Sequence, residues 1–174
     1  QKTYGTYALT GTVALAGGVT VEIAKSFQGG DPAYHTLFED GASPYAIVLA
    51  ADASESERWA AEELRHWLGE IGGVTLPIET AEDALPEYGI VVGYHPSVDS
   101  ARPADGDESF TYRSVGPRIH IWGGRDRGTM YGVMAFLERE FGVRFYTPKV
   151  TVAPSRRSYA FRGLYRHEAP SLRV

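Results

Sequence analysis

The feature that most constrains the fold is a short apolar run, Ile119 to Trp122, which ends at the pair Gly123-Gly124. A run of this length and composition is typical of a strand, and paired glycines are typical of a tight turn. Apolar residues then recur at helical spacing, at Met130, Val133, Met134, Leu137 and Phe141. The stretch therefore predicts a strand, a turn and an amphipathic helix that ends near residue 141, which is a unit of α/β proteins.

The turn itself allows two interpretations. Asp126 is placed to cap the helix, and one glycine of the pair to supply a positive φ. Alternatively, the helix N-terminus could bind an anion, with Arg125 and Arg127 beside it. The glycine spacing does not match a phosphate-binding loop, because Thr129 stands where its lysine should be. We predict capping by Asp126, and keep both arginines as candidates for a ligand or domain interface.

A second helix is signalled by Ser54 and Glu57, which form a Ser-x-x-Glu capping box. One apolar face follows, made of Ala60, Leu64, Trp67, Leu68 and Ile71. This face is expected in the core, Trp67 included, and Gly72-Gly73 are expected to end the helix. The preceding apolar run, residues 45–50, predicts a central strand covered on both faces.

The remaining elements are expected to be strands. They are predicted at residues 12–15, 19–24, 76–79, 88–93, 107–115, 118–122 and 143–146, with short extended pieces at 150–152, 159–161 and 164–166. The fold class is therefore α/β (α+β), a mixed β-sheet with two main helices, preceded by a β-hairpin extension. The predicted domains are the hairpin at 1–30, a loop at 31–44, the α/β domain at 45–166 and a linker toward a downstream domain at 167–174.

Composition excludes several classes of protein. The 174 residues carry a net charge of −5, with lysine and arginine scattered, which predicts no nucleic-acid partner. No apolar run approaches the roughly 20 residues that cross a bilayer, so no membrane contact is predicted. The chain has no cysteine, which excludes disulfides, thiolate catalysis and thiolate zinc sites.

The sequence contains no clear motif for a metal site or for acid–base catalysis. His66 is followed one helical turn later by Glu70, so the His-Glu-x-x-His zinc pattern is missing, and no metal or cofactor is predicted. Glycoside hydrolysis needs two carboxyl groups roughly 5 to 10 Å apart beside a cleft. Three pairs of acids lie close together in the sequence: Glu62 with Glu63, Glu138 with Glu140, and Asp107 with Glu108. The helical pairs are interpreted as solvated faces, and no catalytic residue is predicted.

Candidate binding residues are identified by their position relative to the predicted strands. Tyr94 and His95 come directly after a predicted strand, where ligands gather in open α/β sheets. Trp122 and Tyr146 could offer stacking faces to a sugar, although core or interdomain packing is the favoured interpretation.

The C-terminal third predicts a docking surface. Its large apolar side chains lie in extended pieces with no helix to cover them, at Phe145, Tyr146, Phe161, Leu164 and Tyr165. Together with Arg144, Arg162 and Arg166, they are expected to contact a downstream domain.

Four landmarks carry a family resemblance. They are residues 45–64, Gly89 to Gly93, Asp107 to Phe110, and the stretch from Ile119 through Pro148. Their succession resembles the N-terminal accessory domain of bacterial α-glucuronidases, and the related domains of β-N-acetylhexosaminidases, α-N-acetylglucosaminidases and uncharacterised Bacteroides-type saccharide-degradation proteins. The resemblance covers about residues 45–166.

The resemblance implies a zincin-like fold without a metal site, in a non-catalytic domain that packs against a downstream catalytic barrel. It also implies an extracytoplasmic location, which is periplasmic, surface-bound or secreted. Two alternatives stay open: a stand-alone carbohydrate-binding module that uses exposed tryptophan or tyrosine, and a free-standing hydrolase with an unrecognised site.

Overall fold

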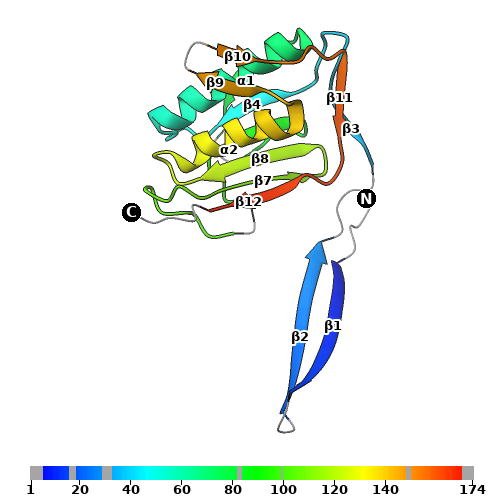
Figure 1. Ribbon diagram of the computed structural model, residues 1–174. Coiled ribbons are helices and arrows are strands. Elements are labelled where there is room, and N and C mark those ends of the chain that lie inside the picture. Colours follow the sequence, from blue (N-terminus) through cyan, green and yellow to red (C-terminus); the bar gives the residue numbers. More distant parts are fainter. Residues whose placement is uncertain are drawn as a thin grey trace.

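The computed structural model describes residues 6–15, 19–28, 33–81, 84–98, 100–147 and 150–169. Its main element is a six-stranded mixed sheet in the order β12-β7-β8-β6-β4-β5 (Figure 1). The strands are β4 (Ala46–Leu49), β5 (Ile78–Thr80), β6 (Gly89–Val92), β7 (Phe110–Val115), β8 (Arg118–Gly123) and β12 (Tyr165–Glu168). Strands β5, β4, β6 and β8 are parallel, and β7 runs antiparallel to both of its neighbours. The predicted mixed sheet is confirmed.

Two helices lie on the same face of this sheet (Figure 1). Helix α1 (Glu55–Gly72) contacts β4, β5 and β6, whereas α2 (Gly128–Phe136) contacts β7 and β8. A π-helical turn, η1 (Leu137–Phe141), continues α2. Side chains alternate between the faces of a strand, so the aligned Ile47, Ile90 and Ile119 all face the helices, where they are fully buried. Strand β4 is buried throughout as predicted, but it lies second from the edge rather than at the centre.

The first helix has the predicted termini. Both bonds of the capping box at Ser54 are present, and Gly73 ends the helix in the left-handed conformation at φ 67°. Trp67 differs from its prediction, because it is half-buried at the flank of the apolar face. Its indole packs edge-on against Phe145 at 5.7 Å, and its N–H donates to Glu63 at 2.9 Å.

This position sets the expected effect of Trp67→Ala. We expect a loss of about 2 kcal/mol in the free energy of unfolding, below the roughly 3–5 kcal/mol of a fully buried tryptophan, because the ring keeps solvent contact. Urea unfolding measures it. Trp59→Ala is the control on the same helix, since that ring is 45% exposed, and should change stability by less than about 0.5 kcal/mol. A Trp67→Ala cost as small as that of Trp59→Ala would contradict the packing described here.

The second helix buries most of the predicted face, since Val133, Leu137 and Phe141 are fully buried. Met130 and Met134 are only half-buried. The close contact is made instead by Gly132, where an added Cβ would lie 3.0 Å from Ile121 and 3.2 Å from Phe110. The glycine lets the helix approach the sheet closely. Leu137 and Phe141, at the two ends of the π-helical turn, both reach the core.

Three two-stranded sheets complete the fold. Strand β3 (His35–Glu39) pairs with β11 (Ser158–Phe161), and β9 (Arg144–Thr147) pairs with β10 (Val150–Val152). Strands β1 (Thr6–Leu15) and β2 (Val19–Gln28) pair with each other, so the predicted hairpin is confirmed and longer than expected, although its turn at 16–18 lies outside the described residues.

Two predicted loop segments contain strands. The segment 31–44, predicted as a loop, holds β3, and β12 extends into the predicted linker at 167–174 as far as Glu168. Both strands are short and find their partners far along the chain, so no local periodicity marks them. Residues 31–32 and 170–174 lie outside the described residues.

In the part of the chain that the structure describes, no helix combines the length and the apolar character that a membrane-spanning segment requires.

Candidate functional site

Polar side chains converge where β4, β6 and β8 end. Asp52 lies between β4 and α1, Tyr94 and His95 follow β6, and Arg125 follows β8. The carboxyl ends of parallel strands share one edge of a sheet, which is the usual place for a site in an open α/β fold.

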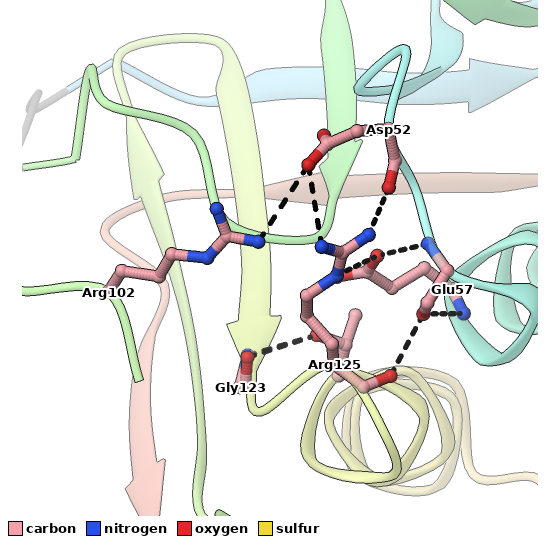
Figure 2. A network of polar contacts seen from close by, with 7 residues as sticks. Asp52, Glu57, Arg102, Gly123 and Arg125 are labelled. Carbon is pink, nitrogen blue, oxygen red and sulfur yellow. Dashed lines mark hydrogen bonds and ion pairs between the residues drawn. The ribbon is translucent and has the colours of Figure 1, made fainter. Parts of the chain in front are cut away.

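Arg125 is the centre of this edge (Figure 2). Its guanidinium donates to the main-chain oxygen of Asp52 and lies 3.4 Å from that residue's carboxylate. On its other side, Nε lies 3.9 Å from Oε2 of Glu57, whose side chain is only 5% exposed. Arg102 also approaches Asp52, at 3.9 Å. The arginine therefore holds two loops to the start of α1.

Glu57 and Ser54 complete the network. Oε2 of Glu57 accepts from the Ser54 main-chain N–H at 2.7 Å, while Ser54 Oγ accepts from the Glu57 N–H and donates to the Arg125 carbonyl at 2.9 Å. Gly93, at φ 102°, gives the carboxylate room, since an added Cβ there would lie 2.9 Å from Oε1. Because its carboxylate already serves the helix cap and Arg125, Glu57 has a structural role.

Ser54 thus has two structural roles, which makes Ser54→Ala informative. We expect it to lower the free energy of unfolding by about 2 kcal/mol, from loss of the cap and of the bond to the β8–α2 turn. Thermal or urea unfolding measures the loss.

The matched control is Ser56→Ala, two residues further on. The Ser56 hydroxyl is buried without a partner among the described residues, so its removal should be neutral or slightly stabilising. Equal losses in the two variants would contradict the role assigned to Ser54.

The turn after β8 differs from its prediction. Asp126 is exposed, the N-cap position is Arg127, and no side chain caps α2. Thr129 Oγ1 instead accepts from the Gly123 N–H at 3.1 Å. Neither glycine of the pair has a positive φ. Gly123 and Gly124 are required for space, since an added Cβ on either would lie under 3.0 Å from main-chain atoms. Capping by Asp126 is therefore wrong.

At this edge, the side chains of Tyr94 and His95 make contacts within the protein rather than being exposed for a ligand. The Tyr94 hydroxyl donates to the Ser100 carbonyl at 3.2 Å, and Arg102 lies 6.0 Å from the ring centroid. His95 is buried, and its Nδ1 accepts from the Ser97 N–H at 3.1 Å, which places the ring proton on Nε2. Among the described residues, Nε2 has no hydrogen-bond partner.

The other candidates lie apart from this edge. Trp122 is 5% exposed on the sheet face opposite the helices, with the Arg113 guanidinium 5.6 Å from its ring. It lines a shallow depression together with Tyr165, which is 70% exposed. Arg166 pairs with Glu168 at 2.6 Å. Trp122 is too deeply buried to serve as a stacking platform.

Arg127 and Tyr146 are both exposed but separate. Arg127 lies 3.8 Å from Glu108, and Tyr146 is 66% exposed on β9. The structure therefore brings Trp122 and Tyr165 together, and Tyr94, His95 and Arg125 to one edge, but assembles no single site from the eight candidates.

The predicted docking surface is only partly present. Phe161 is 3% exposed, and Phe145 and Leu164 pack against the core, so these three belong to the domain itself. Tyr146 and Tyr165 remain exposed on separate sheets. The prediction that the whole segment docks is wrong, because the small sheets bury the residues that lacked a helix to cover them.

Glu140 is a structural residue that sequence reasoning missed. Its carboxylate accepts from Tyr112 at 2.8 Å and from Tyr159 at 3.1 Å. Burial first, and then the charge and hydrogen bonds of Glu140, raise the pKa of both tyrosines. Its interpretation as part of a solvated face is therefore wrong, and no local signal could have found two partners so distant in the sequence.

The described residues contain no cluster of three or more histidine, aspartate or glutamate side chains suited to a metal ion.

Comparison with known proteins identifies this fold in larger enzymes. A family GH115 4-O-methyl-α-glucuronidase with specificity for decorated arabinogalactans matches 79% of this chain at a TM-score of 0.56 and 15% identity. A GH20 β-N-acetylhexosaminidase from Streptomyces coelicolor A3(2) matches 82% at a TM-score of 0.52 and 16% identity. The matches span only 18% and 25% of those two chains. The fold is that of a domain within glycoside hydrolases.

The resemblance that the four landmarks predicted is thus confirmed for the fold. No protein-family model and no curated protein matches the chain.

Proposed function

We propose that this chain is a non-catalytic accessory domain of a multidomain glycoside hydrolase, where it packs against and supports a catalytic domain. The observation that carries the proposal is the size of the match: the fold fills most of this chain but a quarter or less of two glycoside hydrolases. By the same likeness, we propose an extracytoplasmic location.

The state of the carboxylates supports a non-catalytic role. Glycoside cleavage needs a pair of acids that face an open cleft and can exchange protons. Glu57 is tied to a helix cap and Arg125, and Glu140 to two tyrosines. On the first helix, Glu62 pairs with Arg65 and Glu63 accepts from Trp67. The carboxylates of these residues all make hydrogen bonds or ion pairs within the domain.

Exposed apolar side chains support packing against another domain. Tyr146, Val150 and Val152 are 66%, 50% and 53% exposed on the β9–β10 sheet. Phe145, the neighbour of Tyr146 on β9, packs against Trp67 of α1, so this sheet has one face on the core and an apolar face outward.

The test is an assay of the isolated chain against a panel of aryl glycosides and aryl uronides. We expect no turnover above that of a heat-denatured sample. Turnover that disappears on replacing one carboxylate, for instance in Glu108→Gln or Glu39→Gln, would overturn the proposal and favour a free-standing hydrolase.

A further inference from the structure

A depression in the described structure lies at the opposite edge of the sheet from Arg125. It lies beside the amino ends of β4 and β6, where Pro44 precedes β4 and Tyr88 precedes β6. Strand β3 forms the rest of its lining, with Tyr34 just before it. Its volume, about 730 Å³, falls within the range of small-molecule sites.

Two tyrosines present their rings in this depression. Tyr34 is 69% exposed and Tyr88 is 40% exposed, whereas Tyr45 beneath them is buried. The Tyr88 ring is held edge-on against Tyr45 at 5.5 Å, and the Arg162 guanidinium lies 5.0 Å from the Tyr34 ring centroid. Both rings are therefore supported from behind or beside without being covered. Supported aromatic rings offer a large apolar contact at low cost in conformational entropy.

The polar lining favours hydrogen-bond donors. Glu39 and Asp40 are the acids in the lining, and no lysine or arginine lines it. Arg157 engages Asp40 with two hydrogen bonds, one of 3.1 Å to Oδ2. Glu39 lies near the same guanidinium, because its charge, after the hydrogen bond to Asp40, contributes to raising the pKa of Arg157, and its exposed carboxylate can still accept from a ligand. The two carboxylates share this one guanidinium, so an anionic ligand would meet an excess of negative charge in the lining.

We propose that this depression is a binding site for a neutral saccharide. The apolar C–H face of a sugar ring packs on Tyr34 and Tyr88, and sugar hydroxyls donate to Glu39. Uronate and sulfated polymers are disfavoured, because their charge has the same sign as the lining. The site is additional to the accessory role and does not depend on it, since it would bind polymer whether or not a catalytic domain is attached.

Native electrophoresis of the chain in gels that contain a soluble polysaccharide tests the proposal. The neutral probes are galactomannan, xyloglucan and mixed-linkage glucan, and the anionic probe is polygalacturonate. We expect at least one neutral polymer, and not polygalacturonate, to retard the chain. Tyr34→Ala and Tyr88→Ala should each weaken the apparent affinity at least about tenfold, as expected for truncating an aromatic contact at the centre of a site.

Tyr146→Ala is the matched control. Its ring is as exposed as that of Tyr34 but lies on β9, outside the depression, so retardation should not change. The high exposure of Tyr34 means that Tyr34→Ala should keep the fold, which circular dichroism verifies. Three results would overturn the proposal: no retardation by any neutral polymer, retardation that survives both Tyr34→Ala and Tyr88→Ala, or an equal loss in Tyr146→Ala.

Discussion

Replacing Gly124 with alanine is expected to lower the free energy of unfolding by about 4 kcal/mol or more. A Cβ at this position would lie closer than 3.0 Å to the main-chain oxygens of Ala104, Asp105 and Asp107. These are backbone atoms, which cannot rotate away as a side chain can, so the 104–107 segment must leave β8 or carry severe strain. Urea unfolding of the purified variant measures the loss.

Gly116→Ala is the matched control. Gly116 has φ 58° and open space around it, so an alanine there meets only the intrinsic cost of the left-handed conformation, about 1 kcal/mol. The Gly124→Ala loss should therefore exceed that of Gly116→Ala by roughly 3 kcal/mol. Two equal losses would mean that the 104–107 segment does not lie against β8 as described.

The contrast between these two glycines explains what sequence can predict about this fold. Gly116 sits in the two-residue turn between β7 and β8, where a glycine between two strand-like segments is itself a turn signal. The role of Gly124 depends on a segment that comes earlier in the chain and folds back over the turn. In the first case the local sequence indicates a turn glycine. In the second it does not reveal that the glycine is needed for close packing.

The first helix was predictable because its signals are also local. Ser54 and Glu57 are three residues apart, and the bonds between them form within one turn. Arg125 contacts the same pair from the far end of β8, and nothing near residue 125 indicates this partner. The carboxyl edge could thus be located from strand order, but its ion-pair network could not.

The two edges of the parallel strands differ in a way that bears on function. At the carboxyl edge, Arg125 and its carboxylate partners satisfy one another and close the usual ligand position. At the amino edge, Tyr34, Tyr88 and Glu39 remain available beside an open depression. From the sequence we predicted a ligand position at the carboxyl edge, because ligands usually bind there in open α/β sheets. The exposed tyrosines and the open depression favour a site at the amino edge instead.

Acidification from pH 7 to pH 4 is expected to destabilise the chain, and His120 alone should contribute about 3 kcal/mol of the loss. The imidazole is 2% exposed, and burial, followed by the charges of Arg118 and Arg113, lowers its pKa from 6.5 to about 4. The folded chain therefore keeps His120 neutral until about pH 4, while the unfolded chain protonates it near pH 6.5. Because the unfolded state binds more protons in this window, stability falls as the pH falls through it.

His120→Leu isolates this contribution. The carboxylates titrate in both chains, so the difference between wild type and variant, measured by urea unfolding at pH 7 and at pH 4, reports the imidazole alone. We expect the variant to lose about 3 kcal/mol less than the wild type over this range. A His120→Leu chain that loses stability as steeply as the wild type would mean that the folded chain admits the protonated imidazole, through water that reaches Nδ1, which has no partner among the described residues.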